Sequence, residues 1–182
     1  MMCDMEVLGV VLAGGAGKRV GGSKASLELC GRPLIAYPIA ALREAGLEPV
    51  VVAKRDTPLP ELDVTVVHDA SDVLHPLAGV LAALSHADGP VLVVGTDMPD
   101  VPPQLLRRLA DADEAADVVV AKAAGQLEPL CARYSPRVRK ALERALANEA
   151  PLRATVEAMN PLYVGTDAAA VRNVNTLADL AG

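Results

Sequence analysis

The sequence predicts a single α/β domain, residues 1–182, built as a Rossmann-like three-layer sandwich with a mostly parallel central sheet. Three observations predict this fold class. Short β-branched apolar runs recur along the chain, and each run is continuous rather than alternating, as in strands buried on both faces. The segments between several of these runs have the amphipathic pattern of helices that cover a sheet. A length of 182 residues is typical of one domain.

Five apolar runs are the predicted strands of the sheet. They lie at residues 7–12, 49–53, 64–67, 91–94 and 118–121. Three predicted helices lie between or after them, at residues 33–45, 76–87 and 102–110. Each of these helical segments begins with a proline, which the first turn of a helix tolerates, and the first two end at Gly46 and Gly89.

The last third of the chain has a less regular pattern. We expect an edge strand at residues 130–134, preceded by a turn at Gly125, and a helix at residues 136–148 that Ser135 caps. Thr176 and Asp179 have the spacing of a capping box and predict a terminal helix.

Charge and composition exclude several classes of partner. With 17 Lys and Arg residues against 23 Asp and Glu, and with neither Phe nor Trp, the chain lacks both the positive charge and the aromatic platforms that bind nucleic acid. Cys3, Cys30 and Cys131 form no disulfide or zinc pattern. Acidic residues precede the first basic one, Lys18, unlike a signal peptide, and no uncharged apolar run approaches membrane-spanning length. We therefore expect a cytoplasmic protein with neither nucleic acid nor membrane as a partner.

A glycine-rich basic loop follows the first predicted strand, at residues 12–24. It carries five glycines together with Lys18, Arg19 and Lys24. Glycines let consecutive backbone N–H groups turn toward phosphate oxygens, and the cationic side chains supply positive charge. The loop is therefore typical of a triphosphate-binding site, although a flexible basic surface loop is the alternative interpretation.

Two well-known glycine motifs do not match this loop. The Walker motif requires Ser or Thr after Gly-Lys, whereas Arg19 follows Gly17-Lys18. The dinucleotide-binding motif requires a glycine where this chain has Val20. The phosphate site is therefore of another kind.

Polar residues at strand ends are the remaining candidates for the site. Asp97 follows the strand at 91–94, where a carboxylate suits Mg²⁺, and a turn aspartate is the equally weighted alternative. Asp69 follows the strand at 64–67, in Val66-Val67-His68-Asp69, and is either a site residue or a surface turn residue. Asn173 and Asn175 are two residues apart and would lie on the same side of an extended segment, where they are candidates for binding. A role in a turn or a helix cap is the alternative for them.

Neither a Ser or Cys nucleophile motif nor an obvious paired acid and base is found in the sequence. A phosphate acceptor needs neither, because it is largely ionised at neutral pH and attacks directly. Positioning and electrostatic neutralisation would then carry the catalysis.

These motifs together resemble the nucleotidyltransferases that activate sugars and cofactors and, more narrowly, the molybdenum cofactor guanylyltransferases, the MobA family. The resemblance spans nearly the whole chain. It rests on Leu12-Ala13-Gly14-Gly15, Arg19, Gly21-Gly22, Lys24, Leu34, Val50–Val52, His68-Asp69, Pro76-Leu77-Ala78-Gly79, Thr96-Asp97-Met98-Pro99, Glu128-Pro129-Leu130 and Asn173-Val174-Asn175-Thr176. It implies the fold of the nucleotide-diphospho-sugar transferases.

The resemblance also implies an activity and a set of site residues. The reaction would be Mg²⁺-dependent transfer of GMP from GTP to the terminal phosphate of molybdopterin, the organic part of the molybdenum cofactor, with release of pyrophosphate. Transient contacts with cofactor-biosynthesis proteins or molybdoenzyme chaperones would accompany it.

By resemblance, Arg19, Lys24 and Asp97 are catalytic, and Asp97 binds the metal. Leu12, Ala13, Gly14, Gly15, Lys24, Asp69 and Asp97 bind the nucleotide, and Asn173 and Asn175 bind the acceptor. Apart from the resemblance, Arg133 and Arg153 are further candidates to meet an anionic acceptor, with ordinary solvated arginines as the alternative.

Three alternative functions stay open. Cytidylyl transfer from CTP is the nearest one: Gly14-Gly15 goes with guanine in the resembling families, but Ala53-Lys54-Arg55 stands where the guanylyltransferase pattern usually has an asparagine. Either Lys54 substitutes for that asparagine or the selection of the base is looser. A nucleotide-binding regulatory protein without turnover is the second, and the presence of Lys24 and Asp97 argues against it. A sugar-phosphate uridylyltransferase is the third, although the resembling enzymes of that kind are longer.

Overall fold

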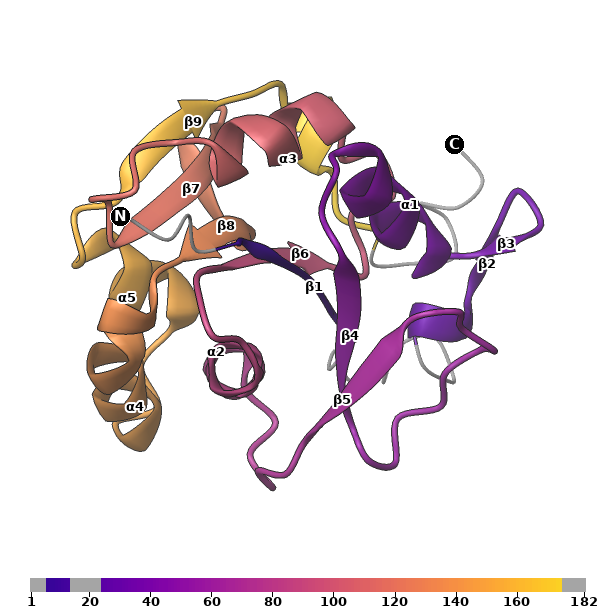
Figure 1. Cartoon of the computed structure of the whole chain (residues 1–182), viewed down its shortest axis with the longest axis horizontal. Coiled ribbons are helices and arrows are strands. Elements are labelled where there is room, and N and C mark those ends of the chain that lie inside the picture. The colour runs from indigo at the N-terminus through magenta and orange to yellow at the C-terminus, as the bar shows by residue number, and fades with distance from the viewer. Residues whose placement is uncertain (1–5, 14–23, 175–182) are drawn as a thin grey trace.

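A mixed seven-stranded sheet forms the centre of the computed structural model, which describes residues 6–13 and 24–174 (Figure 1). The order across the sheet is β5-β4-β1-β6-β8-β7-β9. The bounds are β1 Leu8–Leu12, β4 Pro49–Lys54, β5 Thr65–Asp69, β6 Val91–Gly95, β7 Val118–Ala123, β8 Gln126–Tyr134 and β9 Leu162–Gly165. A separate two-stranded sheet joins β2 (Glu28–Leu29) to β3 (Arg32–Pro33).

Helices cover both faces of the large sheet (Figure 1). Helices α1 (Ala36–Glu44) and α3 (Pro103–Ala110) pack on one face, and α2 (Pro76–His86), α4 (Arg139–Ala147) and α5 (Leu152–Glu157) pack on the other. Three 3₁₀ segments, η1 (Lys24–Ser26), η2 (Pro136–Val138) and η3 (Ala168–Val171), complete the described elements. None of the described helices is long and apolar enough to cross a membrane. The predicted α/β sandwich is confirmed.

The continuous apolar runs form strands because both faces of the sheet are buried. In β1 the side chain of Val11 belongs to the core that includes Leu42 of α1, whereas its neighbour Val10 belongs to the opposite core with Leu77 of α2. Successive side chains of a strand point to opposite faces, so a strand between two helical layers needs apolar residues at every position. All five predicted strands are present.

Four parallel strands bring their carboxyl ends to one edge of the sheet. Strand β1 pairs in parallel with β4 on one side and with β6 on the other, and β4 pairs in parallel with β5. The chain connects outward from β1 in one direction first and then returns to its other side, which makes β1 the switch point of the topology. Ligands of open α/β sheets bind at the carboxyl ends of the strands beside such a point.

The prediction of an edge strand at residues 130–134 is wrong in position. These residues belong to β8, which lies inside the sheet and pairs antiparallel with both β6 and β7. The hairpin turn that joins β7 to β8 contains Gly125, with a φ of 81°, as the sequence predicts. Because the hairpin returns on the β6 side of β7, β8 is inserted between them, and β9 forms the edge instead.

Helix boundaries differ from the predictions near two prolines. The helix expected from Pro33 begins at Ala36, because Arg32 and Pro33 pair with β2. The helix expected at 136–148 is divided into η2 and α4, and the Ser135 hydroxyl caps η2 by accepting a hydrogen bond from the Arg137 N–H at 3.3 Å. The predicted capping box at Thr176 and Asp179 lies outside the described residues.

Candidate active site

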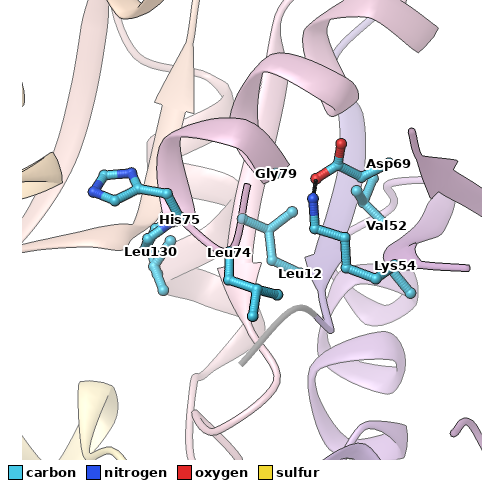
Figure 2. Close-up of a pocket in the computed structure, with 10 residues that line it drawn as sticks. Leu12, Val52, Lys54, Asp69, Leu74, His75, Gly79 and Leu130 are labelled. Carbon is cyan, nitrogen blue, oxygen red and sulfur yellow. Dashed lines mark hydrogen bonds and ion pairs between the residues drawn. The ribbon is translucent and has the colours of Figure 1, made fainter. Parts of the chain in front are cut away.

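An apolar cavity of about 270 Å³ opens at the carboxyl edge of the sheet, between α2 and the ends of β1, β4 and β5 (Figure 2). Its apolar wall consists of Leu12, Val52, Leu74, Pro76, Gly79 and Leu130. A Cβ at Gly79 would lie 3.3 Å from both terminal methyl carbons of Leu12, so glycine keeps this wall open. Pockets for drug-sized ligands usually exceed about 300 Å³. The cavity therefore suits a single flat ring system, such as a nucleobase.

Lys54 and Asp69 form the polar end of this cavity and point toward one another (Figure 2). The Lys54 ammonium lies 2.5 Å from Asp69 Oδ2 and also donates to the Ser71 carbonyl. The other carboxylate oxygen, Oδ1, accepts from the Ser71 N–H at 2.9 Å. The two side chains are only 13% and 7% exposed. A buried pair in which both charges are hydrogen bonded is held in one geometry.

A second ion pair lies at the ends of β1 and β6. Lys24 Nζ lies 3.0 Å from Asp97 Oδ2, and both side chains are about one-fifth exposed. Thr96 ties the two strands together, because its hydroxyl and its N–H both donate to the Leu12 carbonyl. A Cβ at Gly95 would lie 2.7 Å from Asp97 Oδ1, so glycine there leaves room for the carboxylate to fold back over the strand end. The Asp97 carboxylate is thereby held next to the carboxyl ends of β6 and β1.

A bulge in β8 brings Glu128 and Leu130 to the same edge. The register between β7 and β8 shifts from the Val120–Ala132 pair to the Ala121–Glu128 pair. The buried Tyr134 hydroxyl donates to the Pro129 carbonyl at 2.7 Å, which satisfies a backbone acceptor within the bulge. Bulges re-aim side chains and are common beside active sites.

Glu128 and Asn173 lie next to Asp97. The Val174 N–H donates to the Asp97 carbonyl at 2.8 Å and thereby attaches the segment that carries Asn173 to the end of β6. Burial raises the pKa of Glu128, and the nearby Asp97 carboxylate raises it further. Arg153 and a hydrogen bond with Asn173 oppose that change. Glu128 and Asn173 thus lie close to the Asp97 carboxylate, which in turn pairs with Lys24.

Replacing Glu128 by glutamine is expected to make the ligand-free protein more stable, relative to the wild type, as the pH rises. A carboxyl whose pKa is raised by folding binds its proton more tightly in the native state, so its contribution to stability is present below about pH 4.5 and is lost as it ionises. We expect the difference in free energy of unfolding, Glu128→Gln minus wild type, to increase between about pH 4 and about pH 7.

Denaturant unfolding at several pH values measures this difference. Glu143→Gln removes the same charge from an exposed position of α4 and is the matched control. A Glu128→Gln variant that loses stability relative to the wild type on the same pH increase would contradict the expectation. A carboxylate that costs stability where it lies is typical of a functional site.

The donor set at this edge fits a magnesium ion. Mg²⁺ takes one or two carboxylates and fills its other positions with water and substrate phosphate oxygens, so it needs no closed protein cage. Asp97 and Glu128 offer carboxylates, and Asn173 offers an amide oxygen, all of them hard ligands. The Lys24 ammonium, 3.0 Å from Asp97, shows that a cation is accommodated beside this carboxylate. Among the described residues, no three His, Cys, Asp or Glu side chains group together as a metal site.

The two candidate arginines have different environments. The Arg133 guanidinium is buried and donates to the carbonyls of Ala110, Ala112 and Asp113, so it closes the carboxyl end of α3 and does not meet an acceptor. Arg153 is nearly half exposed, donates to Gln126 Oε1 at 2.9 Å and lies 3.9 Å from Glu128. Arg153 therefore remains a candidate for the acceptor side.

Cys131 offers no nucleophile for a covalent mechanism. Cys131 is buried in the sheet, and burial raises the pKa of its thiol to about 12. Cys30 is exposed in the turn between β2 and β3. The thiolate is the reactive form of cysteine, so Cys131 is unreactive near neutral pH.

The structure brings together most of the predicted site residues that it describes. Leu12 and Asp69 line the cavity, Ala13 continues from Leu12, and Lys24, Asp97 and Asn173 lie at the strand ends beside it. Gly14, Gly15, Arg19 and Asn175 lie outside the described residues. Sequence reasoning assigned no role to Glu128 and left the role of Lys54 open. The only signal for Glu128 was its place in the Glu128-Pro129-Leu130 motif.

Comparison with known proteins identifies the group to which this arrangement is similar. The family model described as MobA-like NTP transferase domain matches residues 9–162. A probable molybdenum cofactor guanylyltransferase from Pyrococcus furiosus is 35% identical, and the match covers 96% of this chain and 94% of that protein.

Solved structures have the same architecture. The molybdopterin-guanine dinucleotide biosynthesis protein A of Archaeoglobus fulgidus superposes with a TM-score of 0.77 at 26% identity, over 96% of this chain and 95% of that one. The 2-C-methyl-D-erythritol 4-phosphate cytidylyltransferase of Thermus thermophilus has a TM-score of 0.71 at 21% identity, over 97% and 96% of the two chains. The second likeness shows the fold alone.

Proposed function

Because the chain belongs to the family of MobA-like NTP transferase domains and is a nucleotidyltransferase, we propose that it transfers GMP from GTP to the terminal phosphate of molybdopterin. The product would be a pterin guanine dinucleotide and the leaving group pyrophosphate. The observation that carries the proposal is the adjacency of the Lys24–Asp97 pair to an apolar cavity at the switch point of the sheet. The proposed phosphate site at Lys24 and Asp97 then lies next to the proposed base site in the cavity, as the phosphates and the base of one nucleotide require.

The chain's own residues have separate tasks in this reaction. The cavity holds the base, and Lys24 neutralises the triphosphate together with Arg19, which lies outside the described residues. Asp97 would hold Mg²⁺, with Glu128 and Asn173 within reach on the acceptor side. When bound, the metal supplies positive charge to the phosphate oxygens.

The acceptor requires no general base. Its phosphate is largely ionised at neutral pH, and one of its oxygens attacks the α-phosphorus of GTP as the bond to the β-phosphate oxygen breaks. Repulsion between the two anions is the main obstacle. Lys24, held beside Asp97, lowers it with its positive charge, and the resemblance assigns Arg19 the same task. The buried, unreactive thiol of Cys131 agrees with this direct transfer, which needs no covalent enzyme intermediate.

Nucleotide-dependent thermal stabilisation tests the choice of donor. GTP with Mg²⁺ is expected to raise the unfolding midpoint more than CTP, ATP or UTP. A ligand at about 100 times its Kd stabilises the native state by about 2.7 kcal/mol, or roughly 5–10 °C for a domain of this size. Inorganic tripolyphosphate with Mg²⁺ is the control, because it carries the phosphates without a base.

The outcome separates the alternative functions. A larger shift with CTP would favour a cytidylyltransferase, for which Ala53-Lys54 in place of the usual asparagine is the specific observation. GTP binding without formation of a dinucleotide from molybdopterin, followed by mass spectrometry, would favour a regulatory protein or another acceptor. The cytoplasmic location and the contacts with cofactor-biosynthesis proteins or molybdoenzyme chaperones stay predictions.

A further inference from the structure

Lys54 presents a fixed positive charge to the nucleobase cavity. It lies at the carboxyl end of β4, and its ammonium is held between Asp69 Oδ2 at 2.5 Å and the Ser71 carbonyl. The side chain is 13% exposed. Lysine side chains on a surface sample many rotamers, but this one is anchored by two acceptors and largely removed from water. Its ammonium is therefore a preorganised part of the cavity wall (Figure 2).

The hydrogen-bonding capacity of Lys54 is not exhausted by these two partners. An ammonium has three N–H donors and no acceptor. Asp69 and Ser71 take two of the donors, and no third partner is found among the described residues. Apart from Asp69 and His75, the other residues that line the cavity are apolar. One charged donor is therefore available to a ligand, in surroundings where a hydrogen bond is worth more than in water.

The chemistry of this donor distinguishes between purine bases. Guanine has a carbonyl oxygen at position 6, which accepts hydrogen bonds, whereas adenine has an amino group there, which donates. A lysine ammonium facing a 6-amino group would place two donors against each other and leave both unsatisfied in a partly desolvated site. A 6-oxo group instead accepts a hydrogen bond from the ammonium.

We propose that Lys54 is a specificity-determining residue that donates a hydrogen bond to O6 of guanine and so selects 6-oxopurines over 6-aminopurines. The proposal rests on the proposed guanylyl transfer and assigns to one side chain the recognition of its donor. An asparagine at this place could donate or accept through its amide, whereas the ammonium only donates. The departure from the usual asparagine therefore makes selection at this atom stricter.

Asp69 acts through Lys54 as a positioning residue. One of its oxygens holds the ammonium and the other holds the Ser71 N–H, so both are already engaged in the free protein. The carboxylate also balances the charge that Lys54 brings into the cavity. Direction and neutralisation of the ammonium both depend on this one buried side chain.

Binding of two triphosphates that differ at position 6 tests the proposal. GTP is compared by calorimetry, in Mg²⁺, with 2,6-diaminopurine riboside triphosphate, which keeps the 2-amino group, replaces the 6-oxo group by an amino group and therefore carries no hydrogen on N1. The wild type is expected to prefer GTP strongly. Lys54→Met is expected to lower that preference by roughly 10- to 100-fold, the value of one charge-assisted hydrogen bond. Lys140→Met removes the same charge from an exposed position of α4 and is expected to keep it.

Two features of the design keep the result interpretable. Lys54→Met leaves Asp69 without its counter-charge, so Lys54→Gln is tested beside it and is expected to lie between Lys54→Met and the wild type. The preference is a ratio within one variant, so partial loss of folded protein cancels. The role of Lys54 would be overturned if the wild type binds GTP but shows no preference for it over the 6-amino analogue. It would also be overturned if Lys54→Met and Lys54→Gln both keep the wild-type preference. Absence of GTP binding by the wild type would contradict the proposed function itself.

Discussion

Asp97→Asn is expected to lower Mg²⁺-dependent pyrophosphate release by roughly 10³-fold, because it removes the carboxylate that lies at the centre of the site. The substitution keeps the shape of the side chain, so the contact with Lys24 and the room left by Gly95 are retained. What changes is the charge. An amide binds a hard divalent cation much more weakly than a carboxylate does.

The assay couples pyrophosphate release to the presence of GTP, molybdopterin and Mg²⁺, and Mn²⁺ binding to the free protein is measured by electron paramagnetic resonance. Asp100→Asn is the matched control, because Asp100 lies three residues further on in an exposed pair with Arg172 at 2.9 Å. Full activity and full Mn²⁺ binding in Asp97→Asn would rule out the metal assignment. Loss of activity with intact Mn²⁺ binding would move the metal to another carboxylate, of which Glu128 is the nearest candidate.

Lys24→Met is expected to change turnover and metal affinity in opposite directions. Turnover falls by roughly 10²-fold, because a cation that neutralises the triphosphate in the transition state is lost. Mn²⁺ affinity of the nucleotide-free protein rises, because the ammonium 3.0 Å from Asp97 Oδ2 no longer competes for the carboxylate. A merely structural lysine would lower both quantities together.

Steady-state kinetics and Mn²⁺ titration on the same preparations measure the two effects. Lys140→Met again controls for the change in net charge. Unchanged turnover would remove Lys24 from the catalytic residues, and weaker Mn²⁺ binding would show that the ion pair supports the site instead of competing with the metal. The double variant with Asp97→Asn is expected to be no worse than Asp97→Asn alone, since residues of one cluster do not act additively.

The fold was largely predictable because its local signals agree with its burial. Five continuous apolar runs became strands that contact helices on both faces, and the helices predicted at 76–87 and 102–110 are α2 and α3. The wrong predictions concern segments whose structure depends on which strand they pair with. Nothing in residues 130–134 distinguishes an interior from an edge strand, and Pro33 joins a short hairpin that its own propensity does not predict.

The site was predictable as a list of residues but not as a set of contacts. Glycines, cations and carboxylates at strand ends are visible in the sequence, and their chemistry suggests phosphate and metal. Arg133 is equally visible, yet it caps α3 from within the sheet. Glu128 carried no chemical signal of its own and lies at the edge beside a bulge in β8.

The sequence by itself determined the layered fold and the residue types at the carboxyl edge, because burial periodicity and backbone freedom act between near neighbours in the chain. Only the tertiary structure decided which charges meet. Lys24 pairs with Asp97 across 73 residues because β1 and β6 are adjacent, and Lys54 pairs with Asp69 across 15 because β4 and β5 are. Strand order sets these distances, and electrostatic pairing depends on distance.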